Sequence, residues 1–286
     1  MIEVLRAGPL TTVQDQGRPG WAHLGVPRSG ALDPDALRLA NRLVGNPEDA
    51  AGLEITLTGC VLRVTRAVTV ALTGAPADVL VEHGGRRRAG DLGRPLSLPA
   101  GAVLLVGPAR AGVRTWLAVG GGIAVEPVLG SRATDTLSGL GPPPLRDGDR
   151  LPLGPPAGPP PPVDLAVTRP VPDEVRLTVR PGPRQDWFTP AALDLLCGDA
   201  YTVGPDSNRV GARLAGAALP RARAGELPSE GLVLGAVQVP PDGQPLVFLA
   251  DHPTTGGYPV IGVVDDVTPL AQARPGTTVR FHGPQR

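Results

Sequence analysis

The stretch LADHPTTGGYPVI, residues 249–261, places a dense group of polar side chains between two apolar segments. A turn between two strands needs glycine and one short polar residue. This stretch holds in addition a carboxylate, an imidazole, two hydroxyls and a phenol, which donate and accept hydrogen bonds or protons. Two interpretations are therefore open: a hairpin with more polar groups than it needs, or the solvent-facing mouth of a binding site.

A second polar group lies near the N-terminus, in the segment TTVQDQGRPG. Gln14, Asp15 and Arg18 lie there between glycines, which let the backbone approach a ligand closely. An Asp–Arg pair that only braces the loop explains the same residues equally well. The segment RTWLAVGGGI has three glycines after an apparent strand but lacks the GxGxxG spacing before a helix, so the nucleotide signal is weak.

The composition excludes several kinds of chemistry. All 27 basic residues are arginine, so the chain cannot form a Schiff base, hold pyridoxal phosphate covalently, carry biotin or build a P-loop. The formal net charge is zero, which gives no general electrostatic reason to bind nucleic acid or a membrane surface. Cys60 and Cys197 lie far apart and have neither metal-like spacing nor a disulfide framework. We expect no metal and no cofactor bound by this chain.

The termini and hydropathy give an expectation about location. No apolar run reaches the length of a membrane-spanning helix, and the N-terminus has an acid at its third position rather than a basic region followed by an apolar one. We therefore expect a cytoplasmic protein.

Short apolar segments separated by glycine and proline dominate the sequence and predict β-strands. Their spacing is typical of an antiparallel sandwich or barrel rather than of βαβ units. In the first half they are Leu53–Leu57, Val61–Val64, Val68–Leu72, Val79–Val81, Val103–Val106 and Thr115–Val119.

Two segments predict helices. Asp33–Gly45 begins with an aspartate cap and a proline in the first turn, carries Leu37, Ala40 and Leu43 on one face, and ends at glycine. Thr189–Gly198 repeats this order of cap, proline, apolar residues and glycine.

A proline run divides the chain. Residues 154–163 read GPPAGPPPPV, and proline cannot donate a hydrogen bond to a sheet, so this segment is predicted to be an exposed polyproline connector. We expect an N-terminal β lobe over 1–153 and a C-terminal β lobe over 164–286, each with a small helix. The fold class is mainly β with a few short helices.

Several segments together resemble the allophanate hydrolase subunit 2 family, a family of biotin-dependent carboxyltransferase-like proteins, and within it the C subunits of bacterial 5-oxoprolinases. The resemblance runs in order from about Glu3 to Phe281. It departs from the family at Cys60, where proline is frequent, and at Asn208, where an acid is common. The segments that carry it are TTVQDQGRPGWAHLGVPRSGALD, NRLVGN, LEITLTGC, ALTGA, RTWLAVGGGI, LGSRATD, SNRVGARL, GAVQVPPDGQPLVFLADHPTTGGYPVIGVV and AQARPGTTVRF.

The resemblance implies two cyclophilin-like β-barrel lobes and a heteromeric complex with 5-oxoprolinase subunits A and B. The complex uses ATP to open 5-oxo-L-proline to L-glutamate, and this chain is not active alone. Two alternatives stay open. One is a component of a biotin-dependent carboxyltransferase like urea carboxylase, with biotin on another chain. The other is a non-enzymatic regulatory partner of a protein that resembles the B subunit or a kinase inhibitor.

With this family in view, Asp251 is predicted to be catalytic and to accept the N–H of a small lactam or urea, unless it only caps its turn. Gln238, on the preceding strand, is predicted to point into the same mouth. Arg209 and Arg132 are candidates for a substrate carboxylate, although surface pairing is an equal alternative. His252, which precedes a proline, is interpreted as a loop residue rather than a base. The other predicted substrate-binding residues are Thr254, Thr255, Gly256, Gly257 and Tyr258.

Overall fold

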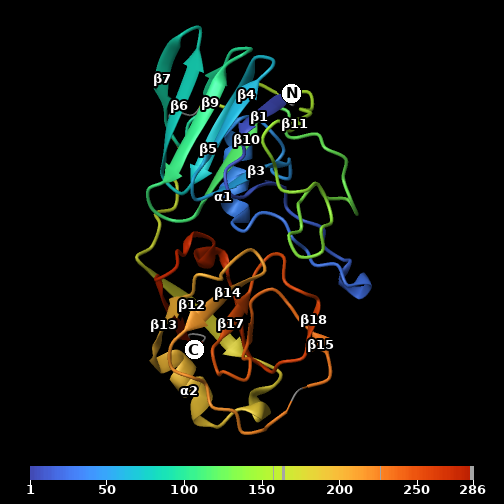
Figure 1. Ribbon diagram of the computed structural model, residues 1–286, viewed down its shortest axis with the longest axis vertical. Coiled ribbons are helices and arrows are strands. Elements are labelled where there is room, and N and C mark those ends of the chain that lie inside the picture. Colours follow the sequence, from blue (N-terminus) through green and yellow to red (C-terminus); the bar gives the residue numbers. More distant parts are fainter. Residues whose placement is uncertain (157, 163–164, 226, 284–286) are drawn as a thin grey trace. The chain divides into compact units, whose positions relative to one another are not determined.

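The computed structural model describes residues 1–156, 158–162, 165–225 and 227–283 (Figure 1). The chain forms two compact units. The first unit consists of Met1–Arg18 and Ser29–Val171, and the second of Pro19–Arg28 and Pro172–Arg286. Both are built mainly of strands, so the predicted mainly-β class is confirmed.

The first unit contains two antiparallel sheets. The six-stranded sheet has the order β11-β1-β4-β9-β6-β7, and the five-stranded sheet has the order β2-β3-β10-β5-β8. The strands of the six-stranded sheet are β1 (Ile2–Arg6), β4 (Cys60–Val64), β6 (Ala77–His83), β7 (Arg86–Gly90), β9 (Val103–Ala109) and β11 (Arg150–Leu151). Those of the five-stranded sheet are β2 (Thr11–Gln14), β3 (Gly52–Thr56), β5 (Val68–Gly74), β8 (Leu96–Leu98) and β10 (Arg114–Val119). The six predicted strands of this region correspond to β3, β4, β5, β6, β9 and β10.

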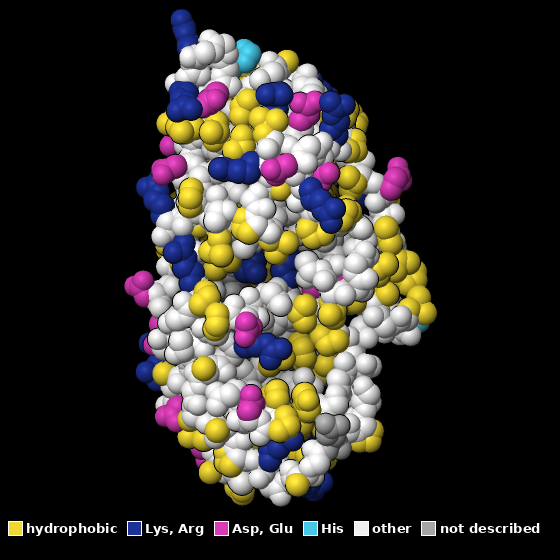
Figure 2. Space-filling view, in the orientation of Figure 1, with side chains coloured by type: hydrophobic (Ala, Val, Ile, Leu, Met, Phe, Trp, Pro, Cys, Tyr) yellow, Lys and Arg dark blue, Asp and Glu magenta, His cyan; other side chains and the backbone are white. Residues whose placement is uncertain are grey.

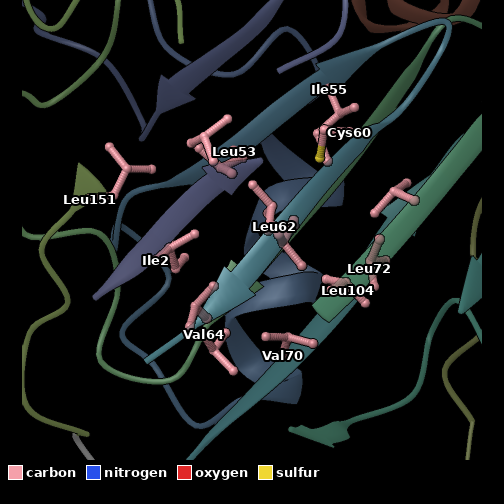
Figure 3. Packing of buried hydrophobic residues seen from close by; sticks show 14 of the residues in the cluster. Ile2, Leu53, Ile55, Cys60, Leu62, Val64, Val70, Leu72, Leu104 and Leu151 are labelled. Carbon is pink, nitrogen blue, oxygen red and sulfur yellow. The ribbon is translucent and has the colours of Figure 1, made fainter. Parts of the chain in front are cut away.

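One hydrophobic core lies between these two sheets (Figure 3). Leu62 and Leu104 come from the six-stranded sheet, and Leu53 and Leu72 come from the five-stranded sheet. Every second residue of a strand points to the same face, so the alternation read from the sequence fills this core from both sides. Truncating one such leucine to alanine is expected to cost about 2–5 kcal/mol of stability.

Helix α1 (Pro34–Leu43) covers the other face of the five-stranded sheet. Its residues Ala40 and Leu43 pack with Ala71 of β5 and Ala118 of β10. The side chain of Asp33 accepts a hydrogen bond from the backbone N–H of Ala36 at 3.0 Å, as the sequence predicted for the N-cap. Predicted helix and predicted buried face are both confirmed here.

The second unit is a closed barrel of seven strands in the order β12-β19-β16-β17-β14-β13-β20. All neighbours run antiparallel except β12 and β20, which pair in parallel. Tyr201 and Phe281 meet edge to face in its interior, with ring centroids 5.9 Å apart. The strands are β12 (Glu174–Pro181), β13 (Ala200–Val203), β14 (Gly211–Ala215), β16 (Ala236–Gln238), β17 (Leu246–Phe248), β19 (Val260–Val264) and β20 (Thr278–His282).

Helix α2 (Ala191–Gly198) packs against β20, and it begins later than predicted. Pro190 is its N-cap residue and no side chain caps it. Thr189 contributes its backbone carbonyl, to which Ala192 N donates at 2.9 Å, instead of its hydroxyl. The cap-proline pattern therefore predicted the helix but not its first hydrogen bond. The short elements of this unit are 3₁₀ turns η1 (Ala22–Leu24), η2 (Gln185–Trp187) and η3 (Thr268–Gln272) and the two-residue strands β15 (Glu230–Gly231) and β18 (Thr255–Gly256).

The predicted connector differs from the division that the structure shows. Residues 157 and 163 of the connector lie outside the described residues, and its described prolines are mostly exposed. The run nevertheless lies along the first unit, where a Cβ on Gly45 would meet the carbonyl oxygen of Pro159 at 2.8 Å. The two units meet between Val171 and Pro172. A proline run cannot join a sheet, but its rings and carbonyls still pack against a neighbouring surface.

The face drawn in Figure 2 carries acidic and basic side chains intermixed, as the zero net charge leads us to expect. Among the described residues, no helix is long and apolar enough to cross a membrane.

Candidate functional site

Asp251 follows β17, and its carboxylate is held by Arg209. Arg209 Nε donates to Oδ2 at 2.9 Å and Nη2 donates to Oδ1 at 3.0 Å, so the guanidinium and the carboxylate form a two-pronged pair. The backbone N–H of Asp251 also donates to the carbonyl of Arg209 at 3.1 Å. The Asp251 side chain is 0% exposed and the Arg209 side chain 1%. The prediction of a solvent-facing Asp251 is therefore wrong.

Barrel register brings the two residues of this pair together. Gly211 of β14 pairs with Phe248 of β17, so the residues just before β14 and just after β17 lie at the same end of the barrel. Arg209 and Asp251 are 42 residues apart in sequence. A buried charge needs a partner, and the pairing of β14 with β17 supplies it.

Gln238 reaches the glycine turn from β16. Its side-chain nitrogen donates to the carbonyl of Tyr258 at 2.9 Å, and its side chain is buried. Beside it, a Cβ on Gly256 would lie 2.8 Å from the Gln238 Nε2. Because any side chain at that position would press on the amide, glycine is needed there for the close approach. The structure thus brings Gln238, Gly256 and Tyr258 together.

The turn Thr254–Gly257 is bound by the loop that precedes β16. β18 pairs with β15 in a two-residue ladder. Leu232 N donates to the Thr254 carbonyl at 2.8 Å, and Leu227 N donates to the Gly257 carbonyl at 3.1 Å. Thr254 is half-buried and Thr255 is exposed. The hydroxyls of this turn therefore differ in their access to solvent.

Two arginines of the second unit support the same loop. Arg184 Nε donates to Glu230 at 2.8 Å and a second guanidinium nitrogen donates to the other oxygen. These hydrogen bonds lower the pKa of the Glu230 carboxyl below its ordinary value. The guanidinium of Arg221 lies 5.9 Å from the centre of the Tyr258 ring, within the range of a cation–π contact. Tyr258 is therefore held at its carbonyl by Gln238 and at its ring by Arg221.

Arg132 lies in the first unit, and the structure does not group it with the residues of the turn. Its Nε donates to the carbonyl of Val125 at 2.7 Å, and its backbone N–H donates to Asp15 at 2.6 Å. The other oxygen of Asp15 accepts from Ser131 Oγ at 2.6 Å. Asp15 thus fixes the segment that carries Arg132, in line with the bracing interpretation of the N-terminal loop.

Sequence analysis missed a buried network around Glu54 of β3. Its carboxylate accepts from Arg114 Nε and Trp116 Nε1, each at 3.2 Å, and from Leu32 N at 3.0 Å. The signal was present as an acid inside the apolar strand LEITL. An acid in a strand that is buried on both faces calls for a charged or hydrogen-bonding partner.

The remaining reactive side chains show little sign of nucleophilic or metal chemistry. Burial raises the pKa of Cys60 to about 12 and raises that of Cys197 above its ordinary value, so both remain thiols at neutral pH. His252 is buried, with Nδ1 2.7 Å from the carbonyl of Pro253, so that nitrogen carries the proton. Within the part of the chain that the structure describes, no three His, Cys, Asp or Glu residues gather as a metal site.

Residues 24–283 match the family described as carboxyltransferase domain, subdomain A and B. The chain belongs to this carboxyltransferase domain family. The resemblance noted from the sequence segments is thereby confirmed. Among the relatives, the C subunit of 5-oxoprolinase from Escherichia coli (strain K12) is 39% identical over 98% of this chain and 90% of its own length. Urea amidolyase of Lachancea kluyveri is 32% identical over 98% of this chain, which spans only 17% of that protein.

Solved structures agree with this carboxyltransferase domain assignment. The chain superposes on the crystal structure of TTHA0988 with a TM-score of 0.87 and 40% identity, covering 98% of this chain and 55% of that one. It superposes on the urea amidolyase of K. lactis with a TM-score of 0.88 and 29% identity, covering 99% of this chain and 19% of that one. The chain therefore spans about half of one solved relative and a smaller part of the other.

Proposed function

We propose that this chain is the C subunit of an ATP-dependent 5-oxoprolinase, which opens 5-oxo-L-proline to L-glutamate together with subunits A and B. The observation that carries the proposal is the 39% identity to the 5-oxoprolinase C subunit of E. coli, over 98% of this chain and 90% of the relative. A second relative of the same name, from Haemophilus influenzae, is 30% identical over the same shares. Both relatives are named as subunits, which supports a role within a complex, in the cytoplasm as we expect.

The chemistry of the reaction explains why such a subunit needs partners. Amide resonance makes the lactam inert, and phosphorylation of its oxygen by ATP creates a leaving group that water can displace. This chain has no lysine and no phosphate-binding motif. We therefore assign ATP to a partner, no cofactor to this chain, and the binding and orientation of the lactam or its intermediate to this chain.

We propose that the substrate-binding residues lie around the turn Thr254–Gly257, with Gln238 and Tyr258 beside it. The hydrogen bond from Gln238 to the Tyr258 carbonyl supports this grouping. Since both oxygens of Asp251 accept from Arg209, we now propose Asp251 as a positioning residue that holds the guanidinium in place. Arg132 is proposed only as a separate contact from the first unit.

The test is reconstitution of the complex. Co-expression of this chain with subunits A and B from the same source should give glutamate and phosphate from 5-oxoproline and ATP. Leaving out this chain, or using it alone, should abolish turnover. A verified three-subunit complex without 5-oxoproline-dependent ATP hydrolysis would refute the proposal, and robust turnover by the single chain would refute the division of labour.

A component of a biotin-dependent carboxyltransferase is the second candidate. It is favoured by the family description and by the urea amidolyase relative, in which this chain spans 17% of the length. Biotin would have to be attached to another chain, since this one has no lysine. Urea- and bicarbonate-dependent ATP hydrolysis with a biotin-carrying partner, and none with 5-oxoproline, would favour this candidate.

A further inference from the structure

The side chains of Gln14 and Thr134 lie against each other in the first unit. Gln14 ends β2, and its Nε2 donates to the Thr134 carbonyl and to Thr12 Oγ1, each at 3.0 Å. Thr134 N donates in return to the carbonyl of Val13 at 2.9 Å. Turning the amide over would set its oxygen against the Thr134 carbonyl, so the contacts fix which end of the amide faces which way.

This arrangement leaves two buried oxygen atoms without a hydrogen-bond partner among the described residues: Gln14 Oε1 and Thr134 Oγ1. The Gln14 side chain is 0% exposed and Thr134 is 1% exposed. Buried polar atoms in native folds are nearly always bonded, and an unbonded one lowers stability. Both carboxylate oxygens of neighbouring Asp15 are bonded, to Gly17 N, Ser131 Oγ and Arg132 N. The two unsatisfied oxygens are therefore an exception within a well-bonded loop.

A positive charge lies beside these two oxygens. Arg18 is buried, its Nε donates to the Val128 carbonyl at 3.3 Å, and its Nη2 donates to the carbonyl of Ala133, the residue before Thr134. A guanidinium in a poorly solvated place disfavours a cationic ligand such as ammonium and favours a ligand with a partly negative oxygen.

We propose that Gln14 and Thr134 form a binding site for the cis edge of a small amide. The ligand N–H donates to Gln14 Oε1, and the ligand carbonyl accepts from the Thr134 hydroxyl. A lactam, a urea or a primary amide presents an N–H and a carbonyl on one edge, whereas a trans secondary amide presents them on opposite edges. This site goes beyond the proposed function, because it lies in the first unit and its occupation needs neither ATP nor a partner subunit.

The test uses 2-pyrrolidinone as the probe and the full chain alone, with binding followed by calorimetry or ligand-detected NMR. N-methyl-2-pyrrolidinone has the same ring and carbonyl but no N–H, so it should bind more weakly. Thr134→Val keeps the shape and removes only the hydroxyl. It should weaken 2-pyrrolidinone binding by roughly 2- to 12-fold, as the loss of one neutral hydrogen bond predicts.

Stability gives the second readout. Because the Thr134 hydroxyl has no partner among the described residues, Thr134→Val should leave the melting temperature unchanged or raise it. Thr115→Val is the matched control: its hydroxyl is also buried but donates to the Ala75 carbonyl at 3.0 Å, so this variant should lower the melting temperature and leave probe binding unchanged.

Three results would overturn the proposal. The first is the absence of 2-pyrrolidinone binding by the natural sequence, and the second is equal binding of the N-methyl derivative. The third is a fall in melting temperature for Thr134→Val as large as for Thr115→Val, which would assign the two oxygens to a structural buried water. None of these results depends on whether the assembled complex hydrolyses 5-oxoproline.

Discussion

The substitution Asp251→Asn distinguishes the structural from the catalytic interpretation of the polar stretch 249–261. Asparagine keeps the shape of the side chain but removes its charge and replaces one acceptor oxygen by a donor nitrogen. Both carboxylate oxygens of Asp251 accept from Arg209, at 2.9 and 3.0 Å. The substitution therefore removes one of these hydrogen bonds and places a neutral amide against a buried guanidinium.

The expected loss of stability is large. Removing one member of a buried ion pair costs about 3–5 kcal/mol, because the remaining charge stays in the interior without its counter-charge. For a unit of this size, the melting temperature should fall by on the order of 10–20 °C. If Asp251 instead binds a substrate N–H as its main role, activity should fall by roughly 10- to 150-fold at an unchanged melting temperature.

The assay pairs calorimetric melting of the chain with turnover by the reconstituted complex. Asp265→Asn is the matched control in the same barrel, since Asp265 forms the same two-pronged pair with Arg180 at an exposed position. It should shift the melting temperature by only about 3 °C or less. The double variant Arg209→Met with Asp251→Leu removes both buried charges and should recover most of the lost stability. Equal shifts for Asp251→Asn and Asp265→Asn would refute this reasoning.

Three further substitutions test other parts of the fold and site. Gly256→Ala should change the melting temperature little, because its Cβ would meet only the movable ends of side chains, at 2.8 Å from Gln238 Nε2, yet it should lower the activity of the complex by displacing that amide; unchanged turnover would contradict this role. Glu54→Gln should destabilise the first unit by about 3 kcal/mol, as calorimetry can check, since it takes the charge from a buried pair with Arg114; a loss below about 1 kcal/mol would contradict it. Burial raises the pKa of Cys60 from 9.0 to about 12, so as pH rises from 9 to 12 the unfolded chain loses this proton first and stability falls, by up to about 1.4 kcal/mol per pH unit. Melting curves at pH 8–11 should therefore be flatter for Cys60→Ala.

The sequence predicted the strands and α1 because local pattern determines them. Alternating apolar residues define β3 and β10, and the aspartate–proline start with a closing glycine defines the bounds of α1. The beginning of α2 was less well predicted, since a backbone carbonyl and not the Thr189 hydroxyl meets its first free N–H. Cap patterns record which side chains are available, and tertiary packing decides which of them bonds.

The contacts of the candidate site were harder to predict, because barrel register sets them. The residue types around Asp251 indicated a polar centre, but the Arg209 partner depends on the pairing of β14 with β17 across 42 residues. Likewise, Arg132 and the turn at Gly256 looked like parts of one group in the sequence, while contacts place them in different compact units. Composition identifies polar residues that need partners, and only the register identifies the partners.

Stability can separate the two kinds of buried polar group in this chain. Both carboxylate oxygens of Asp251 are bonded to Arg209, so removal of this side chain should lower stability whatever else it does. Thr134 Oγ1 has no partner among the described residues, so its removal should leave stability unchanged or increase it. A polar atom that weakens the fold is retained by selection only if it serves function, because stabilising substitutions there would otherwise be free to accumulate. A rise in melting temperature with a loss of amide binding in Thr134→Val would thus mark a functional position, and parallel losses in Asp251→Asn would mark a structural one.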